Sequence, residues 1–400
     1  MPATVKVNSG YSIKIRKGLI QRLGLEILRL NEEETSETEH EILLVTDEKV
    51  SGLYLQKVIT NFQECPKPDG TKLRICELLI NSHERAKNFM TVTKLLDDMA
   101  GLGLSKKCCV VALGGGVVCD AAGFAAGCYM GGVRLVLVPT TLAAMIEASV
   151  GGNAFLNLST GKNLAGMIHT PSLVLCDTES LRTLSPEEYK SGIAETLKTA
   201  IMAGEDLFRI FERGEVDGNI ESIIDGCIKF RAGVSNDGKN QSSKVDVAET
   251  DNDKSVRDEA ECVSNDAVGN ASVSVSGEIR SKCLGYEIGN AIESLSNYEI
   301  QHGLALAQGI GIVANASAKM EWCNEDTKDR IINTLKRNDL PVTCRKFKPE
   351  IIAQNVLNGR KIAGGNIELV VPSEIGRCEA KSVNSDELAS IIAMGMQTQI

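Results

Sequence analysis

A glycine-rich turn beginning at Gly114 is the stretch of the sequence best suited to hold a phosphate. An apolar, β-branched run at 108–113 precedes Gly114, Gly115 and Gly116, and a helical stretch containing Asp120 follows. Such a turn leaves backbone N–H groups exposed at the start of a helix, where an anion binds favourably. The triple glycine does not match the dinucleotide-binding fingerprint, so by itself the pattern favours a purely structural turn.

A second group of reactive side chains lies on helices predicted further along the chain. Glu195 and Lys198 are three residues apart, so they share one helix face. Tyr286, Asn290 and Glu293 share a face in the same way, through spacings of four and three residues. Taken alone, the Glu195–Lys198 spacing predicts an ordinary ion pair on a helix surface.

The elements that must carry these residues alternate between strands and helices in the first half of the chain. Strands are predicted at 41–47, 73–80, 108–113, 133–138 and 173–177, and helices between them. This alternation predicts a doubly wound, parallel α/β sheet. Ser185, Pro186 and Glu188 form a strong helix start, after which most of the sequence is helical. We therefore predict an N-terminal α/β domain at 1–184 and a mainly α-helical domain at 185–400.

Residues 234–277 differ in composition from the rest of the second half. They are rich in Asp, Asn, Ser, Lys and Glu, contain no aromatic residue and show no periodicity. Because such a segment buries too little apolar surface to offset the entropy of ordering, we predict a polar, disordered insertion. Beyond it the sequence predicts helices at 302–320 and 326–338, a strand at 367–371 and a terminal helix from Asp386.

Composition narrows the class of function. A net charge of −10 over 400 residues argues against a nucleic-acid partner. No stretch is long and apolar enough to span a membrane, and the N-terminus lacks a signal-peptide pattern. The 13 cysteines form no CxxC pair, which favours buried, reduced thiols. We expect a cytoplasmic protein that binds neither membrane nor nucleic acid.

Four segments in fixed order resemble the core of the 3-dehydroquinate synthases, which are sugar-phosphate cyclases. They are ALGGGVVCDAAGF, VPTTLAAMIEASVGG, GKNLAG and CDTESLRTLSPEEYKSGIAETLK. The likeness extends more weakly from about Thr46 to about Glu387. It implies a carbon–oxygen lyase of the shikimate pathway to the aromatic amino acids. Such an enzyme, with NAD and a divalent metal, converts 3-deoxy-arabino-heptulosonate 7-phosphate to 3-dehydroquinate and phosphate.

The resemblance also implies where a tightly held NAD would lie. The expected contacts are Asp47, Glu84, Lys87, Gly115, Gly116, Val117, Val118, Asp120, Thr140, Thr141, Lys162, Leu181 and Thr183. Three of these have a simpler interpretation, because Asp47 could cap the following helix and Glu84 with Lys87 could be a surface pair. Two positions depart from the family, since Cys119 stands where glycine is usual and Asn153 replaces a lysine.

The metal site that the resemblance implies is incomplete. The family holds zinc with a glutamate and two histidines, and Glu195 and His302 match two of these three ligands. The remaining motif reads GYEIGNAIE, which places Tyr286 at the missing ligand and Asn290 at a second lost histidine. A neutral phenol is a poor substitute for imidazole at such a site. We therefore expect weak or absent binding of Zn²⁺ or Co²⁺.

The catalytic positions implied by the resemblance are partly changed. The candidates are Lys162, Asn163 and Lys198, which match the family, and Glu147, Arg231 and Asn290, which replace an aspartate, a lysine and a histidine. Gly131 stands where the family has an arginine that one subunit lends to its neighbour. A homodimer is still expected, but without that contribution.

Three functions remain open at this point. The first is a 3-dehydroquinate synthase, or a divergent cyclase acting on a related sugar phosphate. The second is a catalytically impaired paralogue that keeps the fold and NAD binding and acts as a regulator or partner subunit. The clustering of replacements at the reaction centre favours it. The third is a metal-dependent alcohol or polyol dehydrogenase of the same fold, which the GKN and SVGG segments disfavour.

Overall fold

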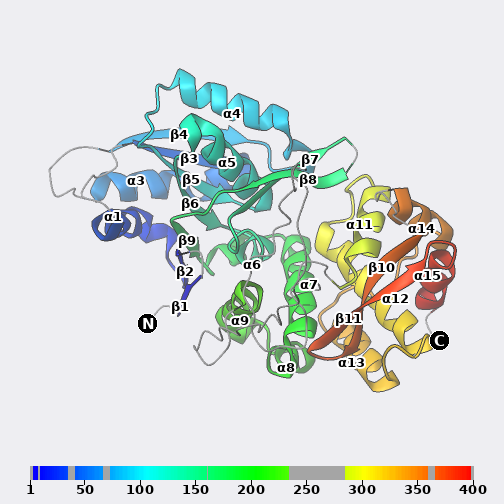
Figure 1. Cartoon of the computed structure of the whole chain (residues 1–400). Helices are drawn as coiled ribbons and strands as arrows, with labels where there is room; N and C mark the ends of the chain where they lie inside the picture. The colour runs from blue at the N-terminus through cyan, green and yellow to red at the C-terminus, as the bar shows by residue number, and fades with distance from the viewer. Residues whose placement is uncertain are drawn as a thin grey trace, which may run out of the picture.

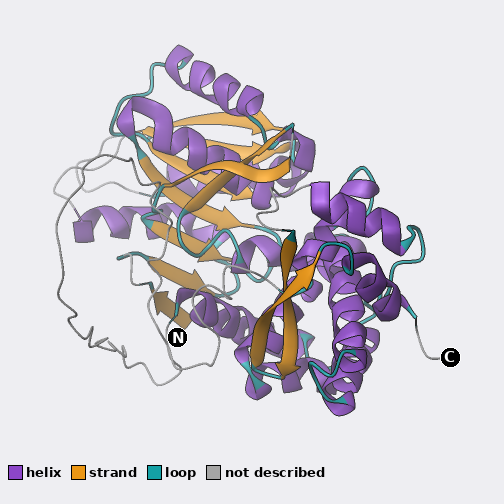
Figure 2. Ribbon diagram, turned by 45° about the vertical axis from the view of Figure 1, so that its right-hand side comes forward, coloured by secondary structure: helices purple, strands orange, loops and turns teal. Residues whose placement is uncertain are grey.

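A seven-stranded sheet forms the first half of the protein, and helices dominate the second half (Figures 1 and 2). The computed structural model describes residues 3–7, 10–34, 41–65, 73–159, 161–233, 284–358 and 365–397. The predicted insertion at 234–277 lies outside the described residues. The division into domains at 184 and 185 stays a prediction.

The sheet has the strand order β1-β2-β9-β6-β5-β3-β4, and only the β1–β2 pair is antiparallel. Its strands are β1 (Ala3–Lys6), β2 (Ser12–Ile15), β3 (Glu41–Asp47), β4 (Arg74–Ile80), β5 (Cys109–Gly114), β6 (Arg134–Pro139) and β9 (Leu173–Cys176). Every residue of the central strand β5 is buried, as expected for a parallel strand covered on both faces. The predicted doubly wound α/β fold is confirmed.

Alternate residues of the central strands pack into two separate cores, one on each face of the sheet. Val111 joins α1 (Leu23–Glu34) and α3 (Gln56–Glu64) in one core. Val110 joins α4 (Phe89–Gly101) and α5 (Gly116–Cys128) in the other, which continues into the helical half. This separation follows from the two-residue period of a strand.

A hairpin that the sequence did not predict lies over α5. It consists of β7 (Asn153–Leu158) and β8 (Gly161–Ile168), and Figure 1 shows it extending from the sheet toward α11. Gly127 allows its close approach, because a Cβ there would lie 2.7 Å from the terminal carbon of Met167. The hairpin carries Lys162, so it positions one of the candidate site residues.

The helical half is built around α7 and α12, which pack against each other. Its elements are α7 (Pro186–Ala203), α8 (Glu205–Arg213), α9 (Ile220–Ala232), α11 (Tyr286–Leu295), α12 (His302–Lys319), α13 (Glu325–Arg337), α14 (Pro349–Asn358), α15 (Leu388–Met396) and the hairpin β10 (Asn366–Glu374)–β11 (Arg377–Asn384). The predicted capping box at Ser185 is confirmed, since its Oγ accepts from the backbone N–H of Glu188 at 3.2 Å. None of the helices within the described ranges has the length and apolarity to cross a bilayer.

Short helical turns join these elements. They are η1 (Ile20–Arg22), α2 (Glu48–Val50), the π-helical η2 (Ser51–Leu55), η3 (Glu84–Ala86), η4 (Tyr129–Gly131), α6 (Leu142–Ile146), η5 (Ser180–Thr183) and η6 (Asp217–Asn219). Several of them begin directly after a parallel strand of the sheet. They therefore bring polar residues to the edge at which those strands end.

Candidate active site

The expected NAD contacts gather at the carboxyl edge of the parallel sheet. Asp47 ends β3, Gly115 follows β5, Thr140 follows β6 and Glu84 follows β4. Because parallel strands end at the same edge, these four residues lie on one side of the sheet, where open α/β folds bind their ligands. Four segments that are far apart in the sequence thus come together as a single candidate surface.

The turn between β5 and α5 fits a pyrophosphate group. Gly115 is the N-cap of α5, and no described side chain caps the helix there. A Cβ on Gly116 would meet no atom within 4 Å, so the backbone of the first turn faces open space. The uncapped N–H groups of Val117 and Val118 and the positive end of the helix dipole can therefore receive an anion. The cradle fits NAD in this respect.

Other expected NAD contacts also have structural partners. Asp47 Oδ1 accepts from the backbone N–H of Val50 at 3.0 Å, which confirms the predicted cap; a cofactor contact there stays a prediction. Lys87 forms an ion pair with Asp120, so Lys87 is paired with a residue other than Glu84. Burial raises the pKa of Asp120 although Lys87 opposes this effect.

Thr141 lies at the start of α6, and Leu181 and Thr183 lie within η5, beside this edge. Thr141 caps α6 by accepting from the backbone N–H of Ala144 at 3.3 Å. Leu181 is buried in η5, and the hydroxyl of Thr183 lies 3.0 Å from that of Tyr54. These positions serve the local fold, and their contact with a cofactor stays a prediction.

Glu195 and Lys198 form a buried ion pair at the centre of α7. Their side chains are 0% and 1% exposed, and Lys198 Nζ lies 2.5 Å from Glu195 Oε2. The same Nζ lies 3.3 Å from Glu147 Oε1, which Arg231 Nη1 approaches to 3.5 Å. The interpretation of this pair as a surface contact is therefore wrong. Four of the candidate residues meet here, although they come from three separate segments.

His302, the first residue of α12, joins this group to the strand edge. Its Nε2 lies 3.0 Å from Glu195 Oε1, and its Nδ1 lies 2.8 Å from Glu293 Oε2. Lys162 Nζ donates to the other oxygen of Glu293 at 2.8 Å and lies 3.5 Å from Glu84 Oε1. We call the resulting sequence of alternating charges the charge chain: Glu84, Lys162, Glu293, His302, Glu195, Lys198, Glu147 and Arg231.

The charge chain sets the protonation states of its buried members. Burial alone would raise the pKa values of Glu195 and Glu293, but the neighbouring cations outweigh it and lower both. Burial alone would lower the pKa of His302, but the two carboxylates raise it to about 10. In the same way, Glu84 and Glu293 overcome burial and raise the pKa of Lys162. At neutral pH Glu195 and Glu293 are therefore ionised, and His302 and Lys162 between and beside them are protonated.

The donors around Glu195 do not fit a tightly held metal ion. The Tyr286 ring meets the His302 ring edge to face, with centroids 5.5 Å apart, and lies 5.7 Å from Lys198 Nζ. Among the described residues, no group of three His, Cys, Asp or Glu side chains could hold a metal. Glu195 Oε1 faces His302 Nε2 as an ion pair, and Asn290 Oδ1 is buried without a hydrogen-bond partner in the described structure. Of the three ligand positions that the resemblance implies, Glu195 and His302 are present, and Tyr286 stands at the third.

Three site residues escaped the sequence analysis as functional candidates. Glu293 links Lys162 to His302, Asn157 Nδ2 donates to Glu84 Oε1 at 2.8 Å, and the Tyr298 ring lies 5.4 Å from Lys162 Nζ. The shared helix face of Tyr286, Asn290 and Glu293 was the available signal for Glu293. No comparable signal exists for Asn157 and Tyr298, because their roles depend on contacts between distant segments.

Asn163, next to Lys162, adopts a backbone conformation that is rare for residues with a side chain. Its φ is +54°, and its backbone N–H donates to Asn157 Oδ1 at 2.9 Å. The bond fixes the bend of β8 on which Lys162 projects toward the helical half. No observation bears on the predicted catalytic role of Asn163, which stays a prediction.

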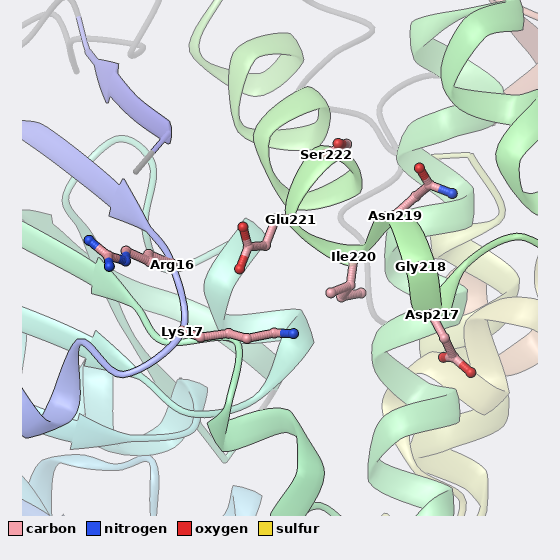
Figure 3. A pocket seen from close by; sticks show the side chains of 8 residues that line it. All are labelled: Arg16, Lys17, Asp217, Gly218, Asn219, Ile220, Glu221 and Ser222. Carbon is pink, nitrogen blue, oxygen red and sulfur yellow. The ribbon is translucent and has the colours of Figure 1, made fainter. Parts of the chain in front are cut away.

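A separate polar pocket of about 610 Å³ opens between the end of β2 and the start of α9 (Figure 3). Its lining includes Arg16, Lys17, Asp217 and Glu221. Arg231 lies at the opposite end of α9, about 15 Å away at 1.5 Å per residue. The pocket is therefore distinct from the charge chain.

Solved structures of known enzymes share this fold. A 2-deoxy-scyllo-inosose synthase complexed with carbaglucose-6-phosphate, NAD⁺ and Co²⁺ has a TM-score of 0.75 and 20% identity over 98% of this chain and 99% of that chain. A 2-epi-5-epi-valiolone synthase from Streptomyces hygroscopicus with NAD⁺ and Zn²⁺ bound has a TM-score of 0.74 and 20% identity, covering 96% of both chains. A probable glycerol dehydrogenase from Sinorhizobium meliloti is less similar, with a TM-score of 0.59 and 13% identity over 96% of this chain.

Similarity in sequence identifies the family more narrowly than the shared fold does. The 3-dehydroquinate synthase of Prochlorococcus marinus (strain SARG) is 31% identical over 96% of both chains. That of Agrobacterium fabrum is also 31% identical, over 96% of this chain and 93% of its own. The family models for the N-terminal and C-terminal parts of 3-dehydroquinate synthase match residues 77–191 and 252–362. These matches, together with the shared fold, show that the chain belongs to the 3-dehydroquinate synthase family of sugar-phosphate cyclases.

Proposed function

We propose that the protein is an NAD-dependent 3-dehydroquinate synthase. It would convert 3-deoxy-arabino-heptulosonate 7-phosphate to 3-dehydroquinate and phosphate in the cytoplasm. The observation that carries this proposal is the charge chain, because it joins the cofactor edge at Glu84 to the buried Glu195–Lys198 pair without interruption. The related enzymes named 3-dehydroquinate synthase support the choice of substrate.

The residues of the chain can supply the proton movements that such a reaction needs. Lys198 Nζ donates to both Glu195 Oε2 and Glu147 Oε1, so the amine can give a proton on the side of Glu147 and take it back later, while Glu195 stabilises its cationic form. Glu147 is the more exposed of these two carboxylates, so it would face the substrate. Lys162 lies near one end of the charge chain and Arg231 lies at the other. Their positive charges would neutralise the phosphate and carboxylate of the substrate.

NAD, when bound, would accept a hydride from the substrate carbon that bears a hydroxyl group and return it to that carbon after phosphate has left. The cofactor is therefore regenerated within one turnover. The protein's part is to hold the pyrophosphate at the start of α5 and the reacting carbon near Lys198. Two solved structures of the same fold contain Co²⁺ or Zn²⁺. In this protein Glu195 and His302 alone would hold such an ion weakly.

A phosphate-release assay with 3-deoxy-arabino-heptulosonate 7-phosphate tests the proposal. We expect NAD-dependent release by the unmutated protein, with and without added Zn²⁺ or Co²⁺, and a loss of at least about 100-fold in Lys198→Arg. Arginine keeps a cation beside Glu195, so folding is protected, but it does not exchange a proton at neutral pH. Absence of release from a protein that binds NAD would reject the proposal.

A second candidate is the catalytically impaired paralogue, which the Tyr286 contact with His302 favours. It would keep the fold and NAD binding and act as a regulator or partner subunit. NAD-dependent thermal stabilisation without phosphate release, under every metal condition, would select it. We further propose a homodimer, as in the family, and sedimentation analysis at several concentrations tests this.

A further inference from the structure

The packing of α11 on α12 fixes the side chain at position 286 beside His302. Gly285 precedes α11 with φ +74°, and a Cβ there would lie 2.6 Å from the backbone nitrogen of Ile310. A Cβ on Gly289 would lie 2.8 Å from Leu306 Cα. These close approaches allow only glycine, so the first turn of α11 is held against α12. The contact of Tyr286 with His302 therefore follows from the backbone and would persist for another ring at 286.

The two remaining metal ligands keep an arrangement that suits a metal ion. Two ligands of a tetrahedral ion with bonds near 2.1 Å lie about 3.4 Å apart. Glu195 Oε1 and His302 Nε2 are 3.0 Å apart, within about 0.4 Å of that separation. In the described structure Glu195 Oε1 faces His302 Nε2 as an ion pair, so the imidazole must release that proton before the two atoms can hold an ion together.

Outer contacts orient both of these ligands. Glu293 holds the Nδ1 of His302 at 2.8 Å, as carboxylates commonly do for metal-ligating imidazoles. Lys198 holds the other oxygen of Glu195. Among the described residues the third expected ligand is missing, and the Tyr286 ring occupies its place beside His302.

We infer that Tyr286 alone keeps this centre free of a resident metal, and that Tyr286→His creates a metal site from Glu195, His302 and the new imidazole. Asn290, the second lost histidine position, lies one turn further along α11 and makes no contact with the Glu195–His302 pair among those described. The inference concerns metal binding without substrate, so it stands or falls separately from the proposed reaction.

Titration of the metal-stripped full chain with Co²⁺ tests the inference. Visible absorption reports four-coordinate Co²⁺, and competition with Zn²⁺ gives the affinity. After dialysis the unmutated protein should retain well under one zinc per chain. Tyr286→His should bind one Co²⁺ at least about 100-fold more tightly, which exceeds the usual contribution of an outer-shell partner.

Three matched variants make the result specific. Tyr286→Phe and Asn290→His should show no gain, and adding Glu195→Gln to Tyr286→His should abolish it. Stoichiometric, dialysis-resistant zinc in the unmutated protein would overturn the inference. An equal gain in Co²⁺ affinity in Asn290→His would also overturn it. So would a Tyr286→His protein that gains no Co²⁺ affinity although its circular dichroism and NAD binding are unchanged.

Discussion

Lys198 Nζ lies 2.5 Å from Glu195 Oε2, and neither side chain reaches solvent to more than 1%. A pair this deeply buried places two charges in the interior at a considerable desolvation cost. Glu147 and His302 bind its outer sides, so the pair is part of a larger network. Such an arrangement is expected where a carboxylate and an amine serve chemistry rather than stability.

Lys198→Met should therefore destabilise the fold strongly. Removing the amine leaves a buried carboxylate with one fewer cation, which typically costs about 3–5 kcal/mol in the free energy of unfolding. Urea denaturation measures the loss. The double variant Lys198→Met with Glu195→Gln should recover most of it, because no uncompensated charge remains. Equal stability of both variants would contradict the assigned pairing.

Gly116→Ala should weaken NAD binding without unfolding the protein. A methyl group at 116 meets no protein atom within 4 Å, so it enters the space assigned to the pyrophosphate. Calorimetric titration should show an affinity at least about 10-fold lower, or about 1.4 kcal/mol. Gly52→Ala is the matched control, since a Cβ there also meets nothing, yet Gly52 lies outside the turn. Unchanged affinity in Gly116→Ala would place NAD elsewhere.

Ser185→Ala should lower stability but leave cofactor affinity intact. The substitution removes the N-cap of α7, for which about 1 kcal/mol is typical, while Glu195 and Lys198 lie three turns further along the helix. Urea denaturation should detect the loss. Ser222→Ala, at an exposed position on α9, should change the free energy of unfolding by less than about 0.5 kcal/mol. A lower NAD affinity in Ser185→Ala would contradict this expectation, because it would mean that loss of the cap displaces the whole of α7.

Local signals predicted the parts of the site that lie within single segments. The run before Gly114 predicted β5, the spacing of Ser185 and Glu188 predicted the start of α7, and Asp47 was identified as a possible cap. Each of these features depends on residues within about four positions of one another. Sequence patterns of that length are enough to determine them.

Contacts between distant segments could not be predicted in this way. Lys162 and Glu293 are 131 residues apart in the sequence, and the β7–β8 hairpin that carries Lys162 lacks a clear alternating pattern. The spacing of Glu195 and Lys198 predicted a shared face but not its burial, because burial depends on α12 and α9 packing against α7. The expected metal ligands, and the replacement of one of them by Tyr286, came from the family resemblance.

Product analysis with a limiting amount of NAD tests the central claim most directly. The protein is incubated with excess 3-deoxy-arabino-heptulosonate 7-phosphate, and carbocyclic product, phosphate and reduced cofactor are measured together by NMR and absorbance. The account predicts one 3-dehydroquinate and one phosphate per substrate, many turnovers per NAD and no accumulation of NADH. Stoichiometric NADH without phosphate would indicate a dehydrogenase, and no product from a protein that binds NAD would indicate the impaired paralogue. Either result would contradict the account.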